Sequence, residues 1–204
     1  ALGVAHEGEA ATEAWAKGHE DEIKKVYEER KQFLYTKQEK SAHLRQILVE
    51  LDKDADAEKT KVAEGKIQAA QNTLKSGTPF AQVARTASED ATSKSRGGDL
   101  GWRRKGRSGL GDEAEGKIFA AKEGEVLGPL KTERGLVLLR VEGFREGDIS
   151  LEKARAELAQ ELWRGARAKE LARKAADEAA AKVKGGAKLA ELYPKAQSDA
   201  EEAQ

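Results

Sequence analysis

The sequence predicts an α+β domain with helical segments on either side of it. Two short runs rich in β-forming residues, 44–51 (LRQILVEL) and 135–144 (GLVLLRVEGF), indicate strands. The second run is almost continuously apolar, as expected for a central strand. Between and around these runs, apolar residues recur at helical spacing. The pair Gly97-Gly98 allows a tight turn, which feeds a further short strand ending at Trp102.

The composition excludes several classes of protein. The chain has 204 residues, in which 37 basic residues balance 37 acidic ones, so it lacks the field of a nucleic-acid-binding protein. It has no cysteine, which excludes disulfides, thiolate metal sites and a cysteine nucleophile. No apolar run of about 18 residues indicates a membrane span. The absence of methionine, an initiator included, indicates a piece of a longer protein, so a signal or membrane anchor could lie outside it.

The N-terminal third is expected to consist of helix followed by a strand. Residues 20–42 are predicted to be helical, because apolar side chains recur at helical spacing from Ile23 to Leu34. This helix either packs on a neighbour or borders a groove for a bound peptide. The strand at 44–51 follows it.

Three alternating aspartates after this strand resemble a calcium-binding loop. They are Asp52, Asp54 and Asp56. The pattern then fails, because Ala57 and Ala63 stand where such a loop needs glycine and a bidentate glutamate. We therefore predict an exposed loop and a helix N-terminus, with no metal site.

The remaining elements follow from helical stripes and turn residues. A stripe from Ala63 to Leu74 predicts one helix, and Pro79 begins the next. The basic segment 103–113 (RRKGRSGLGDE) is either a solvated loop or a site for a phosphate or an acidic client. Residues 112–121 indicate a short helix, and two strands follow it.

A long helix is predicted from Ser150 to the pair Gly185-Gly186, with a tail from Pro194. Its apolar edge is narrow and rich in alanine, so it needs a partner to bury that edge. The partner is either the N-terminal helices or a second chain, and the second choice would give a homodimer through the helical arms.

One segment carries a clear family resemblance. Residues 88–102 (SEDATSKSRGGDLGW) resemble the signature of parvulin-type peptidyl-prolyl isomerases, and so do 44–51, 77–84 and 118–135. Residues 21–51 also resemble the segment before the isomerase domain in secreted foldases of the SurA, PpiD and PrsA group. The resemblance implies a four-stranded antiparallel sheet wrapped by helices. It divides the chain into an N-terminal helical segment (1–42), a parvulin-like domain (43–145) and a C-terminal helical segment with tail (146–204).

The resemblance also identifies candidate catalytic residues. Active parvulins place two histidines in a hydrogen-bonded network beneath a cysteine or aspartate. Asp90 matches the position of the cysteine or aspartate, and Thr132 matches the position of a hydroxyl-bearing residue in the same site. The two positions that usually hold histidine are Gln46 and Val137 in this sequence. His43 lies three residues before Gln46 and is out of register. Without its usual partners, Asp90 is expected to be free to point into solvent.

The implied substrate-binding residues are Leu110, Ala114, Phe119 and Trp102. Leu110 and Ala114 stand where the family has methionine and phenylalanine. An alanine in place of a buried phenylalanine removes about 2–3 kcal/mol of apolar contact with the proline ring. The resemblance thus implies a proline pocket with a weakened wall.

We therefore weigh three functions. The first is a foldase that binds unfolded or proline-containing polypeptide with weak or absent isomerisation; the second is a fully active parvulin isomerase. The third is a purely architectural role for the helical arms. The arms offer four candidate client contacts, which are Tyr27, Phe33, Leu34 and Trp163. The resemblance implies the bacterial periplasm or the outer face of the inner membrane, and no cofactor.

The loop after the first strand bears on substrate choice. Parvulins of the Pin type read phosphate with a basic loop at this point in the chain. Here the loop is LDKDADAE (51–58), which argues against selection of phosphoserine before proline.

Overall fold

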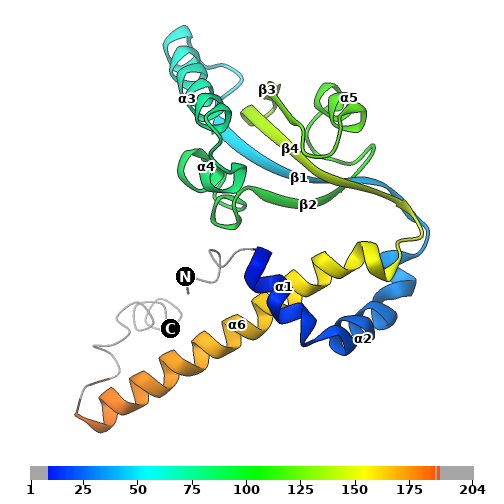
Figure 1. Ribbon diagram of the computed structural model, residues 1–204. Helices are drawn as coiled ribbons and strands as arrows, with labels where there is room; N and C mark the ends of the chain where they lie inside the picture. The colour runs from blue at the N-terminus through cyan, green and yellow to red at the C-terminus, as the bar shows by residue number, and fades with distance from the viewer. Residues whose placement is uncertain (1–8, 187, 189–204) are drawn as a thin grey trace, which may run out of the picture. The chain divides into compact units, whose positions relative to one another are not determined.

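The computed structural model describes residues 9–186 and 188 (Figure 1). Within these residues the chain divides into two units, one made of residues 9–28 with those from 151 onward, the other of residues 29–150. The second unit contains a four-stranded sheet with helices around it, which confirms the α+β class. The tail predicted from Pro194 lies outside the described residues.

The sheet is antiparallel throughout, in the strand order β2-β1-β4-β3. Its strands are β1 (Gln38–Glu50), β2 (Asp99–Arg104), β3 (Val126–Thr132) and β4 (Gly135–Gly147). β1 and β4 lie in the centre and pair along most of their length, from Gln38 opposite Gly147 to Glu50 opposite Gly135. The predicted central position of the strand at 135–144 is therefore confirmed.

The helical prediction for residues 20–42 is wrong at its C-terminal end. Helix α2 (Glu20–Arg30) passes into a π-helical turn, η2 (Lys31–Tyr35), and β1 then begins at Gln38. Lys37 adopts a positive φ of 49°, which ends the helical path. Pairing with the far end of β4 determines this stretch, because a partner strand outweighs weak local helix propensity.

Helices cover the two faces of the sheet separately. One face packs against α3 (Ala57–Lys75) and α4 (Phe80–Ala87), through Ile47, Val49 and Leu138. The other face packs against α5 (Asp112–Ala120), through Leu44, Leu48, Val137, Leu139 and Val141. Figure 1 shows α3 and α4 on one side and α5 on the other. Burial on both faces explains why the central strands read as continuous apolar runs.

The loop after β1 is the helix N-terminus that the sequence predicts. Asp56 is the N-cap of α3, and its Oδ1 accepts a hydrogen bond from Lys59 N at 2.8 Å. The stripe along α3 is buried at Ala63, Ile67 and Ala70. The aspartate after β1 that was compared with a calcium ligand thus caps a helix.

The first unit is helical. It contains α1 (Glu9–Lys17), most of α2, and α6 (Leu151–Lys184), the long helix predicted from Ser150. Arg155 of α6 forms ion pairs with Glu13 and Glu20. The buried residues of α6 all lie in its first half, at Ala154, Leu158, Ala159 and Trp163. No described helix is long and apolar enough to cross a membrane. The predicted boundaries at residues 42 and 145 stay a prediction.

Candidate functional site

A pocket of about 260 Å³ opens on the α5 side of the sheet. We call it the candidate pocket. Five of the site residues predicted from the sequence line it: Gln46, Asp90, Leu110, Thr132 and Val137. They come from β1, the turn after α4, the loop before α5, β3 and β4. The fold therefore brings together residues that lie far apart in the sequence.

Asp90 is the centre of a buried hydrogen-bond network. Its carboxylate is fully buried and accepts hydrogen bonds from Gln46 Nε2 at 2.9 Å and Thr92 Oγ1 at 3.0 Å. Ser93 donates to it from both its backbone N, at 3.1 Å, and its hydroxyl. Arg134 Nη2 adds an ion pair at 3.0 Å. The expectation that Asp90 points into solvent is therefore wrong, because β1, the turn after Asp90 and the β3–β4 turn all supply donors to its carboxylate.

This network keeps Asp90 ionised. Burial by itself raises the pKa of the Asp90 carboxyl. The hydrogen bonds from Ser93, Gln46, Thr92 and Arg134 outweigh that effect and hold the pKa well below its usual range. Asp90 is therefore an acceptor at neutral pH and has no proton to donate to a substrate.

The glycine pair of the signature holds the Asp90 turn against β1. Gly98 has a φ of 80°, donates from its N to Ser93 O, and accepts from Gln46 N at 2.8 Å. A Cβ at Gly98 would lie 2.2 Å from Gln46 O, so no side chain fits there. The signature glycine thus sets the distance between Gln46 and Asp90.

The two residues that the resemblance places at the usual histidine positions differ in their surroundings. Gln46 is buried, and because only its amide NH₂ can donate to a carboxylate, its Oε1 is left as the acceptor. Val137 is 1 % exposed, packs in the α5-side core and carries no polar atom. Neither side chain can exchange a proton as an imidazole does.

His43 belongs to a different cluster. Its Nε2 lies 2.9 Å from Asp99 Oδ1, and the same carboxylate oxygen accepts from Gly101 N at 2.9 Å. Burial raises the pKa of Asp99, but the bonds to His43 and Gly101 and the charge of Arg45 prevail and lower it to about 2. The aspartate of the signature is therefore a structural acceptor that fixes the start of β2.

The predicted substrate-binding residues divide between three places. Leu110 lines the candidate pocket. Ala114 is 3 % exposed in the core beneath α5, where Phe119 also packs, and neither lines the pocket. Trp102 pairs with His43 across β1 and β2, with the Arg145 guanidinium 4.4 Å from its ring. Only Leu110 of these four is thus in position to touch a molecule in the pocket.

Two arginines of the candidate pocket are not among the predicted site residues. Arg134 lies in the β3–β4 turn and lines the pocket. Its backbone carbonyl accepts a hydrogen bond from Leu51 N at 3.1 Å, which ties the turn to the end of β1. Arg103 lines the pocket because the β1–β2 register shifts just before Gly101: Gly101 pairs with Leu44, whereas Asp99 pairs with Arg45. Gly101 has a φ of 71° at this shift. The shift places Leu100 and Arg103 on the same face, although they are three residues apart. The basic run after Trp102 was the sequence signal for Arg103.

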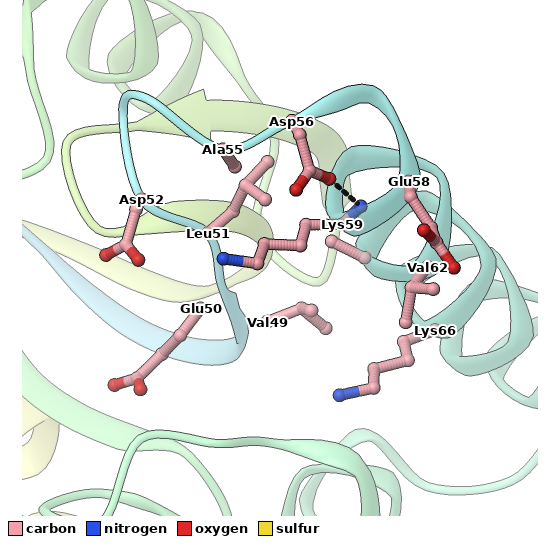
Figure 2. Close-up of a pocket in the computed structure, with 11 residues that line it drawn as sticks. Val49, Glu50, Leu51, Asp52, Ala55, Asp56, Glu58, Lys59, Val62 and Lys66 are labelled. Atoms are coloured by element: carbon pink, nitrogen blue, oxygen red, sulfur yellow. Dashed lines mark hydrogen bonds between the residues drawn. The ribbon is translucent and has the colours of Figure 1, made fainter.

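A second pocket, of about 420 Å³, lies between the end of β1 and the start of α3 (Figure 2). Its walls include Leu51 and Val62, and the Lys59 side chain extends across it (Figure 2). Four carboxylates and two amines line it: Glu50, Asp52, Asp56, Glu58, Lys59 and Lys66. Lys66 is paired with Glu89 at 2.6 Å. This excess of acidic groups disfavours a phosphate.

No group of three or more His, Cys, Asp or Glu side chains in the described part of the chain could hold a metal ion.

The chain matches one known protein family and several curated relatives that share one name. Residues 22–145 match the family described as the PPIC-type PPIASE domain. The chain is 34 % identical over 118 residues to a chaperone SurA of Alkalilimnicola ehrlichii, which covers 58 % of this chain and 26 % of that protein. A chaperone SurA of Saccharophagus degradans is 37 % identical over 93 residues, 46 % of this chain and 21 % of that protein. The chain thus spans about a quarter of the length of these curated relatives.

Solved structures are also similar to this chain. A crystal structure of a PpiC-type peptidyl-prolyl cis-trans isomerase domain is 26 % identical, with a TM-score of 0.47, and covers 54 % of this chain and 96 % of that one. PrsA from Bacillus subtilis is 27 % identical, with a TM-score of 0.44, and covers 81 % of this chain and 59 % of that one.

Proposed function

Since the chain belongs to the family of PPIC-type PPIase domains, we propose that it is part of a periplasmic foldase that binds unfolded, proline-containing polypeptide and isomerises it weakly or not at all. The observation that carries this proposal is the polar network of the candidate pocket. The network is intact and buried, yet Gln46 and Val137 stand at the two usual histidine positions.

The chemistry of rotation about an X-Pro bond supports weak activity. The barrier is about 18–20 kcal/mol, and an enzyme lowers it by stabilising the twisted amide without covalent chemistry. Val137 offers no donor, and Gln46 uses one of the two N–H donors of its amide on Asp90, at 2.9 Å. Ala114 is in the core and cannot grip a proline ring. Leu110 is left as the apolar wall among the predicted substrate-binding residues.

Exposed apolar side chains support binding of unfolded polypeptide. Phe33 is 81 % exposed and Leu34 is 44 % exposed, and both lie in the turn η2 just before β1. Tyr27 and Trp163, the other two candidate contacts, are buried in the helical unit and are therefore excluded from this role. Client binding is thus assigned to Phe33 and Leu34 together with the candidate pocket.

Location and assembly are part of the same proposal. The resemblance to secreted foldases supports the periplasm, including the outer face of the inner membrane if an anchor lies outside this sequence. A homodimer through the helical arms would bury the second half of α6, where Val183 is 41 % exposed.

We expect the chain to give little or no acceleration of cis-trans exchange in a proline tetrapeptide, measured by NMR exchange spectroscopy. The double variant Gln46→His, Val137→His is expected to raise the exchange rate at least tenfold, because it restores two imidazoles beside Asp90. Ala114 is left unchanged, since a phenylalanine in that core would overpack it. Fast exchange by the unmodified chain, insensitive to Asp90→Ala, would favour a fully active isomerase with a different site.

Client binding is expected to slow the aggregation of an unfolded protein at stoichiometric concentration, whether or not that protein contains proline. The variant Phe33→Ser, Leu34→Ser should lose most of this protection, as measured by light scattering, because it removes the exposed apolar pair. Val126→Ser is the matched control, since Val126 is 42 % exposed on β3 and lies outside the proposed surface. Equal protection by the parent chain, the double variant and Val126→Ser would refute the assignment of client binding to Phe33 and Leu34.

A further inference from the structure

Arg103 is a cation of the candidate pocket that has no ion-pair partner among the residues that the structure describes. Its side chain lines the pocket, and its Nε is buried without a hydrogen-bond partner. The structure gives its guanidinium no ion pair with any described residue. A guanidinium carries five N–H donors, and a buried donor without an acceptor costs free energy. Arg103 therefore favours a ligand that brings an acceptor.

The other charges of the candidate pocket are already compensated. Arg134 is paired with Asp90 at 3.0 Å inside the pocket and with Glu50 at 3.4 Å outside it. Glu133 is 86 % exposed and lies 3.4 Å from Lys53. Among the described residues that line the pocket, one positive charge is left over, that of Arg103.

We propose that Arg103 binds a carboxylate of the client polypeptide in the candidate pocket. This inference rests on the proposed function and adds a preference to it. A planar guanidinium pairs with a carboxylate through two parallel hydrogen bonds. One leftover cation matches the single charge of a carboxylate, whereas a phosphate monoester carries about two charges at neutral pH. Asp90 does not repel the ligand strongly, because Arg134 and three neutral side chains compensate it.

The backbone directs Arg103 into the pocket and its neighbour away from it. The register shift opposite Gly101 places Arg103 on the same face as Leu100. Arg104 is exposed, forms an ion pair with Glu39 at 3.6 Å and does not line the pocket. The two arginines have the same charge on the same strand, so Arg104 is a matched control for Arg103.

The carboxylate has two sources in a polypeptide, an acidic side chain and the chain terminus. Three acetylated, proline-containing peptides separate them: one with glutamate before the proline and an amidated terminus, one with glutamine there and an amidated terminus, and one with glutamine and a free terminal carboxylate. Binding is measured by isothermal titration calorimetry with the full chain. We expect at least one carboxylate peptide to bind about five- to tenfold more tightly than the neutral peptide.

Two variants test whether Arg103 is the residue that gives the preference for a carboxylate peptide. Arg103→Gln should abolish the five- to tenfold preference, so that the carboxylate peptides bind no more tightly than the neutral peptide, whereas Arg104→Gln should keep the preference. Equal binding of all three peptides, or a preference that survives Arg103→Gln, would overturn the inference and leave the proposed function standing. Failure of the chain to bind any peptide would overturn both.

Discussion

Replacing Gly98 by alanine is expected to destabilise the domain by at least about 3 kcal/mol. Gly98 has a φ of 80°, and its Cβ would lie 2.2 Å from Gln46 O and 3.0 Å from the Ala84 Cβ. The first distance involves backbone of a central strand, which cannot yield without breaking its pairing with β4. The Asp90 turn would therefore be displaced from β1, and urea unfolding at neutral pH measures the loss.

Gly101→Ala is the matched control for this prediction. Gly101 also has a positive φ, 71°, but no atom lies within 4 Å of its added Cβ. We expect a loss of about 1–2 kcal/mol, the cost of a left-handed backbone conformation alone. Equal losses for the two variants would mean that close approach to β1 contributes nothing at Gly98.

Most of the fold could be predicted from local patterns. The apolar run at 135–144 predicted a central strand, and that strand is β4, buried on both faces. The stripe from Ala63 to Leu74 predicted α3. Residues 38–42 could not be predicted as strand, because their conformation depends on pairing with the far end of β4, about 100 residues later in the chain.

The candidate site could be predicted in part. The resemblance named five site residues that line one pocket in the structure: Gln46, Asp90, Leu110, Thr132 and Val137. It did not predict the burial of Asp90, because two of the donors to its carboxylate come from Ser93 and from Arg134, in a hairpin 44 residues away. Nor could it place Arg103, whose direction depends on the register shift at Gly101. These features follow from tertiary geometry and leave no local pattern in the sequence.

Replacing Asp90 by alanine is expected to cost about 3 kcal/mol or more of folding stability at pH 7, and replacement by asparagine somewhat less. The carboxylate is buried and accepts from Gln46, Thr92, Ser93 and Arg134, so its removal leaves several donors without an acceptor. Asp54→Asn is the control, since Asp54 is an exposed aspartate in the loop before α3. A loss below about 1 kcal/mol for Asp90→Ala would contradict a stabilising network.

The pH dependence of folding stability tests whether the Asp90 carboxylate is ionised within its hydrogen-bond network. Because the folded-state pKa of Asp90 lies below that of the unfolded chain, near 3.9, its contribution is present above about pH 4 and is lost as the pH falls further. We expect unfolding of the parent chain, followed by circular dichroism, to show a marked fall in stability below about pH 4. Asp90→Asn should show a smaller fall. Asp99, whose pKa is lowered to about 2, retains its own part of the acid dependence in that variant. An identical acid profile for the parent and for Asp90→Asn would mean that the Asp90 carboxylate is not preferentially ionised in the folded state.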